Sequence, residues 1–584
     1  MSERRALPFG DRGKPPIRID GAHARRLETA RNRLLVTGSV FALAFLVVAG
    51  RLVELTAYDQ TETPRLAAAS IPETTGRGAI VDRNGMILAT SLPTASLYAD
   101  AREVMDPVAA ADRLMTVLPD FDRERLVARL SEGRFVWIRR NLTPNEQYAV
   151  NRLGIPGLHF ETEERRVYPF GRIAAHVLRL TDRDGRGIAG VEKTFDRELS
   201  AGRTVRLAVD VRVQDVLRQE LTGAIREFRA VGAAGVVLDA RNGELVGMVS
   251  LPDYDPNLPV EGREEDRFNR VTKGVYEMGS AFKLFTVAMA LDSGTTGLGG
   301  GYDASKPLRV ARHTIRDFRG ENRWLSVPEI LVHSSNIGAA QMALDVGGAA
   351  QRRYLGRLGL LSRASIELPE TGSPLTPSPW RDVNTMTVGF GHGIAVTPLQ
   401  LASAVAPLVN GGLWRPPSLL VKHEEAPVEG ERVISARTST QMRGLMRLVV
   451  LHGTGKKAEV PGYLVGGKTG TAEKLVNGRY SRDRRISSFV GAFPIDAPRY
   501  VVLAILDEPK GNKNTHNFAT GGWVAAPLAG RIIERIAPMF GVVPDVGREL
   551  DVKWRPTEPP VKKPLLVAVE EAIADARGRH LAAN

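Results

Sequence analysis

The chain of 584 residues is several times the length of a typical domain, so we expect two or three domains with sizeable cores. Hydrophobic residues make up 43% and charged residues 25% of the sequence, which excludes a globally disordered chain. The absence of cysteine excludes a thiol nucleophile, a thiolate zinc site and a disulfide framework, but it leaves the redox compartment open. A net charge of +13 would suit nucleic acid or anionic lipid, so where the charge sits matters.

Residues 1–33 form a basic leader with nine Arg or Lys against four Asp or Glu, which places +5 of the net charge there. Residues 34–50 follow as seventeen residues without a charge, a stretch about 25 Å long as a helix. We therefore expect a single transmembrane anchor over 34–55, with the leader cytoplasmic and the rest outside the membrane. A cleaved signal peptide is the alternative, because Val47 and Ala49 suit a small-residue cleavage site.

The segment after the anchor carries no pattern of acid, base or nucleophile. Residues 76–90 predict a hairpin that turns at Asn84-Gly85. Residues 100–230 mix helical patterns with short strands. We interpret 56–230 as a scaffold or partner-binding domain.

The pattern changes at residue 233 and indicates a second domain over 231–545. Residues 233–252 predict a strand pair that turns at Asn242-Gly243, and further strands are expected over 486–508. Helical patterns lie between and after them, at 284–294, at 327–347 in two pieces, and at 526–540. This order predicts an α+β domain, with a mixed, largely antiparallel sheet packed by helices. Residues 546–584 read as a proline-rich linker and a short tail.

The stretch GYLVGGKTGTAEK at 462–474 fits two incompatible chemistries. Residues 462–469 match the G-x-x-x-x-G-K-T phosphate loop of nucleotide hydrolases, and 501–508 would be the strand whose acid holds magnesium. That interpretation is a remote alternative, because a domain outside the membrane meets no cytosolic nucleotide. In addition, Asn477-Gly478 predicts a hairpin where a phosphate loop would open a helix.

Read from Lys468, the same stretch is K-T-G-T. The cation of Lys468 and the hydroxyls of Thr469 and Thr471 could hold a substrate carboxylate, while Gly470 would let a peptide pair along the strand edge. A lone K-T-G is close to chance, so this motif needs support from elsewhere in the chain.

A second candidate is Ser280, just before an apolar helical run, with Lys283 three residues later. Residues i and i+3 share a helix face, so the amine can reach the hydroxyl. A serine becomes a nucleophile when a base takes its proton, and a lysine can do so when burial or nearby charge makes it partly neutral. The alternative is an N-cap serine beside a surface lysine.

A third candidate is HSSNIG, which carries Ser334 and Asn336 two residues apart. A hydroxyl and a carboxamide at this spacing could relay a proton to a leaving amine and hold a substrate amide. Taken alone, the pattern is more typical of a helix cap.

Together the three motifs occur in the order S-x-x-K, S-x-N, K-T-G, separated by 54 and 134 residues. In this order and setting the sequence closely resembles the penicillin-binding proteins. GFGHGIAVTPLQLASAVAPLVNGG at 389–412 and RGAIVDRNGMILA at 77–89 are similar to other stretches of that family. Met278 departs from the pattern, because it stands where proline is common.

The resemblance implies a class B enzyme: leader, single anchor, extended pedestal or dimerisation-like domain, and a transpeptidase domain with a five-stranded sheet. There is no room for a glycosyltransferase domain. Ser280 would attack the penultimate D-alanine carbonyl of a peptidoglycan stem peptide, and Lys283 would take its proton. The backbone amides of Ser280 and Thr471 would form the oxyanion hole. The remaining roles would be proton transfer and positioning by Ser334 and Asn336, and carboxylate binding by Lys468, Thr469, Gly470 and Thr471. No metal or organic cofactor is implied, and β-lactams would acylate Ser280.

Within the family the sequence looks most like the septal cell-division type, in the bacterial cytoplasmic membrane. The implied partners are a polytopic glycan-strand polymerase and division proteins. Three alternatives stay open: an elongation-type enzyme, a β-lactamase, for which we identify no hydrolytic glutamate, and a penicillin-binding sensor without cross-linking activity. His333 and His392 lie beside the motifs, but we expect structural roles for both. The HEE at 423 lacks the second histidine of a zinc helix.

Overall fold

The computed structural model of the chain describes residues 32–33, 35–50, 76–132, 134–258, 263–310, 313–422, 429–476, 478–547 and 550. Contacts divide the chain into two units, 1–72 and 73–584. In the first unit, residues 35–50 are helical with exposed side chains. Within the described ranges, no helix combines the length and the apolar character needed to cross a membrane. The expected anchor lies partly outside these ranges, as do most of the leader and almost all of the tail.

The N-terminal part of the second unit is built on a five-stranded sheet. Its strands are β1 (Ile80–Val81), β2 (Ile87–Asp100), β3 (Phe135–Leu142), β4 (Leu158–Val167) and β5 (Val205–Arg206). The predicted hairpin at Asn84-Gly85 is confirmed: Val81 pairs with Ile87, and Gly85 adopts the positive φ of +86° that the tight turn needs. The long strand β2 pairs with both β3 and β4, so it carries the sheet away from this turn.

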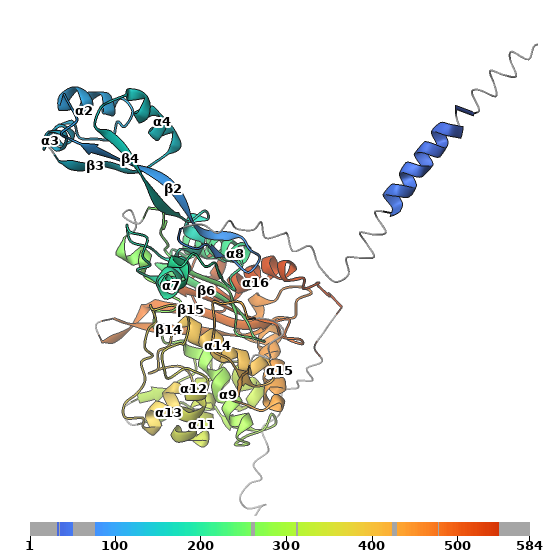
Figure 1. Cartoon of the computed structure of the whole chain (residues 1–584). Helices are drawn as coiled ribbons and strands as arrows, with labels where there is room; N and C mark the ends of the chain where they lie inside the picture. Colours follow the sequence, from blue (N-terminus) through green and yellow to red (C-terminus); the bar gives the residue numbers. More distant parts are fainter. Residues whose placement is uncertain are drawn as a thin grey trace, which may run out of the picture. The chain divides into compact units, whose positions relative to one another are not determined.

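Three helices cover one face of the β2, β3 and β4 strands (Figure 1). They are α2 (Pro107–Met115), α3 (Arg123–Ser131) and α4 (Pro144–Leu153). Asp106, Asp122 and Thr143 cap these helices, because the side chain of each accepts a backbone N–H of the first turn. Short helical segments follow β4: η1 (Gly171–Ala174), α5 (Ala175–Leu178), α6 (Gly190–Thr194) and α7 (Asp196–Ser200).

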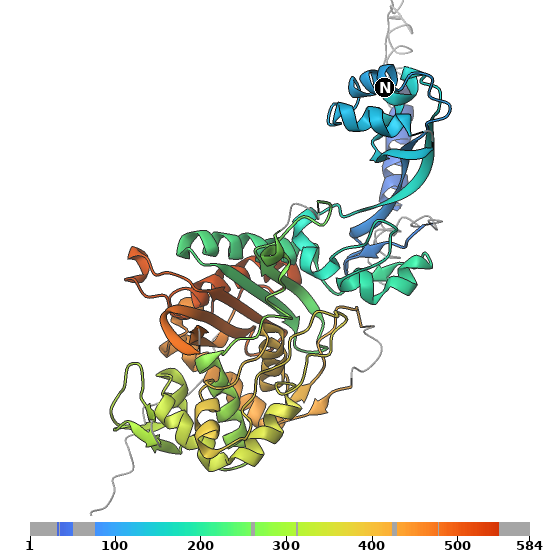
Figure 2. The same cartoon turned by 90° about the vertical axis from the view of Figure 1, so that its left-hand side faces the viewer.

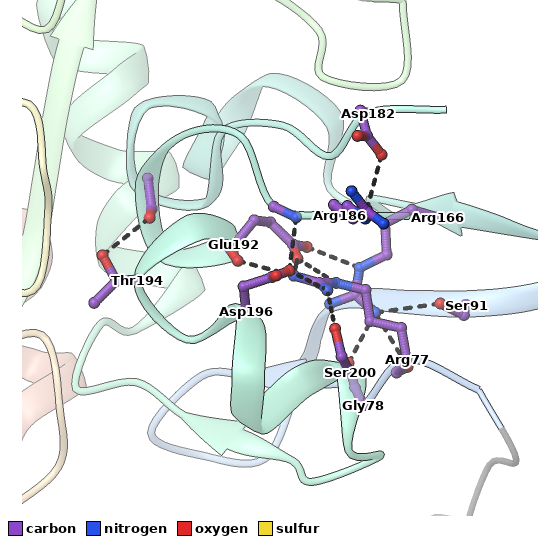
Figure 3. A network of polar contacts seen from close by, with 12 residues as sticks. Arg77, Gly78, Ser91, Arg166, Asp182, Arg186, Glu192, Thr194, Asp196 and Ser200 are labelled. Atoms are coloured by element: carbon purple, nitrogen blue, oxygen red, sulfur yellow. Dashed lines mark hydrogen bonds and ion pairs between the residues drawn. The ribbon is translucent and has the colours of Figure 1, made fainter. Parts of the chain in front are cut away.

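A buried ion network joins the start of this unit to β4 and α6 (Figure 3). The Arg77 and Arg166 guanidinium groups each lie 2.8 Å from the fully buried carboxylate of Glu192. Arg77 also pairs with Asp196 at 2.7 Å. A carboxylate buried in this way is tolerated because two opposite charges and their hydrogen bonds replace water. The network therefore ties together segments that lie far apart in the sequence.

We expect Glu192→Gln to lower the free energy of unfolding by about 3–5 kcal/mol, because it leaves two buried guanidinium groups without their shared counter-charge. The measurement is the urea midpoint of the full-length chain in detergent. Glu161→Gln, on the exposed side of β4, is the matched control and should change stability by less than about 0.5 kcal/mol. Equal midpoints for the two variants would contradict the assigned role of the network.

The larger, C-terminal part contains a second five-stranded sheet, in the order β14-β15-β16-β6-β7. The strands are β6 (Gly232–Asp239), β7 (Leu245–Leu251), β14 (Gly466–Val476), β15 (Arg479–Phe493) and β16 (Tyr500–Asp507). The sequence predicts a mixed, largely antiparallel sheet, and all four strand pairs of the observed sheet are antiparallel. Every residue of β6, β7 and β16 is buried, so both faces are covered, and β14 forms one edge. The predicted strands are confirmed. Asn477, in the turn predicted at Asn477-Gly478, lies outside the described residues.

Helices cover both faces of this sheet, as the two views show (Figures 1 and 2). One face packs on α8 (Val211–Phe228) and α16 (Ala525–Ile536). The helices of the other side are α9 (Lys283–Asp292), α10 (Val327–Val332), α11 (Asn336–Val346), α12 (Gly348–Arg357), α13 (Asp382–Val388), α14 (Pro398–Val409) and α15 (Ala436–His452). The predicted helices at 284–294, 327–347 and 526–540 are thereby confirmed as α9, as α10 with α11, and as α16.

Short elements complete the described part. The strands are β8 (Gly301–Asp303), β9 (Leu308–Val310), β10 (His313–Ile315), β11 (Trp324–Ser326), β12 (Leu413–Trp414) and β13 (Glu431–Arg432). The 3-10 turns are η2 (Glu264–Arg267), η3 (Gly279–Phe282), η4 (Lys456–Ala458), η5 (Lys513–Thr515) and η6 (Pro538–Phe540). Of these, η3 matters most for the site, because it contains Ser280 and leads into α9.

Candidate active site

Ser280 lies in the 3-10 turn η3, and Lys283 is the first residue of α9. Side chains at i and i+3 eclipse each other in a 3-10 turn, and the Lys283 Nζ lies 2.9 Å from the Ser280 Oγ. Gly279 has φ +52°, and a Cβ there would lie 2.5 Å from the Thr471 carbonyl oxygen. Glycine at this position therefore allows the turn to lie directly against β14.

Lys283 is fully buried and its amine meets four oxygen atoms. Besides the Ser280 Oγ, the Nζ lies 2.6 Å from the Ser334 carbonyl oxygen, 3.1 Å from the Ser334 Oγ and 2.7 Å from the Asn336 Oδ1. Burial, followed by the nearby charge of Lys468, holds the pKa of Lys283 well below its ordinary value. A neutral amine has a lone pair, so it can accept the Ser280 hydroxyl proton while its own protons serve other partners. The arrangement suits a general base.

Ser334 lies in the turn between α10 and α11, with the positive φ of +61° that is uncommon for a residue other than glycine. Its Oγ is 3.1 Å from the Lys283 Nζ and 3.0 Å from the Lys468 Nζ. The hydroxyl therefore bridges two amines, and this geometry suits a proton relay between them. Strained backbone of this kind is maintained only where the surroundings fix it.

Asp317 supplies that support. Its Oδ2 accepts the Ser335 hydroxyl at 2.7 Å, and its Oδ1 accepts the backbone N–H groups of Asn336 at 2.5 Å and Ile337 at 3.0 Å. The Ser335 Oγ in turn accepts the Gly338 N–H and caps α11. The cap belongs to Ser335, so the hydroxyl of Ser334 and the carboxamide of Asn336 are left to face Lys283.

Lys468 is fully buried on β14, and its Nζ donates to hydroxyl and carbonyl oxygens. These are the Ser334 Oγ at 3.0 Å, the Thr454 Oγ1 at 3.3 Å and the Thr469 carbonyl at 3.3 Å. Burial lowers the pKa of Lys468 to about 7. Its hydrogen-bond partners among the described residues are neutral, so a substrate carboxylate would meet a cation that lacks a counter-charge.

The three residues after Lys468 contact the nucleophile segment and its surroundings. A Cβ on Gly470 would lie 2.4 Å from the Met278 carbonyl oxygen, so the absent side chain makes room for that segment. The Thr469 Oγ1 lies 2.7 Å from the Thr454 Oγ1, and the Thr471 Oγ1 accepts the Gly521 N–H at 2.9 Å. Met278, at the position where proline is common, is buried in the core.

The structure brings the predicted residues together at the edge strand β14. Five of them share one hydrogen-bonded cluster: Ser280, Lys283, Ser334, Asn336 and Lys468. Thr469 joins through Lys468 and Thr454, and Gly470 and Thr471 line the turn of Ser280. Sequence reasoning missed Asp317 and Thr454, because each reaches the site across a long sequence separation without a local pattern.

The competing sequence interpretations fare differently. GYLVGGKT leads into strand β14 and not into a helix, so the phosphate-loop interpretation is wrong. His392 lies 3.2 Å from Glu277 and His333 lies 3.2 Å from Glu321, and both pairings fit the expected structural roles. HEE at 423 lies outside the described residues.

Comparison with known proteins identifies the two parts of the second unit. Residues 233–534 match the family model of the penicillin-binding protein transpeptidase domain, and 72–219 match that of the penicillin-binding protein dimerisation domain. The probable peptidoglycan D,D-transpeptidase FtsI of Caulobacter vibrioides is 44% identical over 480 residues, which cover 80% of this chain and 82% of that protein. Peptidoglycan D,D-transpeptidase FtsI of Escherichia coli (strain K12) is 31% identical over 508 residues, covering 81% of this chain and 85% of that protein.

Among solved structures, the transpeptidase domain of Burkholderia pseudomallei penicillin-binding protein 3 is similar, with a TM-score of 0.53 and 30% identity. The match covers 58% of this chain and 97% of that structure. The transpeptidase match covers more than half of the chain, and the FtsI proteins resemble both parts of the second unit. The chain therefore belongs to the penicillin-binding proteins, as a class B member most similar to the septal type.

Proposed function

We propose that the chain is a peptidoglycan D,D-transpeptidase that cross-links stem peptides through a Ser280 acyl-enzyme during septal wall synthesis. The observation that carries the proposal is the fully buried Lys283 amine at 2.9 Å from the Ser280 hydroxyl, with its pKa lowered by burial. The names of the FtsI relatives support the same activity.

In the first half of the reaction, the Ser280 Oγ attacks the penultimate D-alanine carbonyl while the Lys283 amine takes its proton. The Ser280 and Thr471 backbone N–H groups hold the oxyanion. The substrate carboxylate binds to Lys468, Thr469 and Thr471. The C–N bond then breaks, the proton returns to the leaving nitrogen through the Ser334 hydroxyl, and D-alanine departs.

In the second half, an amine of a neighbouring stem peptide attacks the acyl-enzyme. The Lys283 amine takes a proton from this attacking amine and passes it to the Ser280 oxygen as the ester bond breaks. The products are a peptide cross-link and Ser280 with its hydroxyl proton restored. β-Lactams enter the first half as substrate mimics and stop there as a stable acyl-serine.

The placement of the chain belongs to the same proposal. The uncharged residues 34–50 after a basic leader support a single anchor over 34–55, with residues 56–230 as pedestal and 231–545 as catalytic domain outside the membrane. The partners that this role implies are a polytopic glycan-strand polymerase and division proteins, alongside the peptidoglycan substrate.

Intact-mass spectrometry after incubation with a fluorescent penicillin tests the acyl-enzyme. The wild-type chain in detergent should gain one adduct, and Ser280→Ala should gain none, because the nucleophilic oxygen is missing. An adduct that persists in Ser280→Ala would contradict the mechanism. Since a penicillin-binding sensor would give the same adduct, release of D-alanine with cross-linked product from polymerised glycan is the second measurement that separates enzyme from sensor.

A further inference from the structure

Glu277, three residues before Ser280, contacts two other segments with one carboxylate. Its Oε1 accepts the Gly393 N–H at 3.0 Å and the Tyr480 hydroxyl at 2.9 Å. Its Oε2 lies 3.2 Å from the His392 Nδ1. The side chain therefore links the nucleophile segment to the 389–393 loop and to the β14–β15 hairpin.

The Glu277 carboxylate is closely surrounded by the ring side chains of the loop and the hairpin. The Glu277 Oε2 is buried and accepts no hydrogen bond within the described ranges, and the His392 Nδ1 lies 3.2 Å from it. Burial and the charge of Glu277 raise the pKa of Tyr480, which keeps its hydroxyl a donor. The rings of His392 and Tyr480 pack edge to face with their centroids 5.6 Å apart, and the Phe390 and His392 ring centroids are 5.4 Å apart.

The 389–393 loop lies directly against the backbone beside Ser280. Gly391 has φ +83°, and a Cβ there would lie 2.1 Å from the Gly279 carbonyl oxygen. On its other side, Gly279 lies against β14, because a Cβ on Gly279 would lie 2.5 Å from the Thr471 carbonyl oxygen. Loop, nucleophile segment and β14 are thus stacked directly on one another, without intervening side chains.

The distal part of the hairpin has less support than its base. Strand β15 pairs with β16 only from Ile486 onward, and the register of β14 shifts after Glu473. Directly after the shift, the Lys474 Nζ lies 2.8 Å from the Asp507 carboxylate and holds the base of the hairpin. Further along, Tyr480 pairs with Leu475, and its hydroxyl donates to Glu277. Glu277 therefore fixes the region where β14 continues past the catalytic residues.

The direction of the substrate gives this region a role. In the proposed function, on which this inference rests, the carboxylate lies toward Lys468 and the scissile carbonyl at Thr471. The peptide upstream of the scissile bond then continues along β14 toward residues 472–476. We propose that Glu277 is a positioning residue that fixes the distal part of β14, through Tyr480 and the 389–393 loop, as a binding platform for the upstream part of the stem peptide.

Steady-state kinetics with two substrates tests this proposal. One substrate is a D-alanyl thioester that carries a complete stem peptide, and the other is a minimal N-acyl-D-alanyl thioester. For Tyr480→Phe and Glu277→Gln in the full-length chain, we expect KM for the long substrate to rise about tenfold. The first variant removes the hydroxyl that donates to the carboxylate, and the second removes the charge that strengthens the hydrogen bonds ordering the platform. We expect kcat to stay within about twofold, and the minimal substrate to be unaffected, because the lost interaction acts on binding alone.

Tyr148→Phe, at an exposed tyrosine of α4, is the matched control and should leave both substrates unchanged. An unchanged KM for the long substrate in both variants would overturn the proposal. So would an equal loss of kcat on both substrates with a lower melting temperature, which is the signature of general loosening. If wild-type protein forms no Ser280-dependent acyl-enzyme with either substrate, the proposed function itself has failed, and this outcome is distinct from the other two.

Discussion

Lys283→Gln should slow acylation of Ser280 by penicillin about 10²–10⁴-fold. Glutamine can still hydrogen-bond to the carbonyl of Ser334 and to Asn336, but it has no lone pair basic enough to take the Ser280 proton. The measurement is the acylation rate constant from quenched-flow mixing followed by intact-mass spectrometry. The expected effect is large because the lowered pKa gives Lys283 a neutral, basic amine at a lower pH than an ordinary lysine has, and an amide nitrogen is not basic.

Two outcomes separate catalysis from folding in that experiment. Lys193→Gln, at an exposed lysine of α6, should acylate at the wild-type rate. The melting temperature of Lys283→Gln shows whether the buried amide is tolerated, and a folded variant that acylates slowly supports the base. A folded variant that acylates at the wild-type rate would assign proton removal to another group.

The second large effect concerns pH and Lys468. Its pKa of about 7 means that the cation that would receive the substrate carboxylate is progressively lost as pH rises through 7. Lys283, in contrast, must be neutral to act, and its lowered pKa provides the neutral form at a lower pH than an ordinary lysine would. We therefore expect the second-order acylation constant of the free enzyme to follow a bell-shaped profile whose alkaline limb lies near pH 7.

Lys468→Arg tests the assignment of that limb. A guanidinium stays charged over the whole accessible range, so the alkaline limb should move upward by more than about two pH units even if the absolute rate falls. The profile is measured with a penicillin that carries a free carboxylate, and the acid limb serves as the internal control. An alkaline limb that stays near pH 7 in Lys468→Arg would assign it to another group.

Local patterns were enough to predict much of the fold. The Asn84-Gly85 and Asn242-Gly243 turns are encoded by neighbouring residues, and both hairpins are present. The order of the catalytic sheet is a different matter, because β6 pairs with β16 across more than half of the domain. No local pattern of strand propensity specifies such a partner.

The candidate site divides in the same way. Ser280 and Lys283 lie within one turn, so their proximity follows from helix geometry. The hydrogen bonds from the first backbone N–H groups of α11 to Asp317, and the positive φ of Ser334, arise only when the chain has folded. Sequence reasoning also offered an edge-pairing role for Gly470, whereas the structure adds a steric reason, the close approach of Met278.

The hydrogen bonds that link Lys283 to Ser334 and Ser334 to Lys468 also make the site a reporter of folding. Lys283 and Lys468 are 185 residues apart, and the strand and the helical layer that carry them must both be in place before the two amines share one hydroxyl. Contacts between segments this distant form late, because the chain must close a long loop before they can be made. If the proposed chemistry holds, the fraction of chains labelled by a fluorescent penicillin measures the fraction whose catalytic domain has completed its tertiary structure, which gives a direct assay for destabilising variants anywhere in that domain.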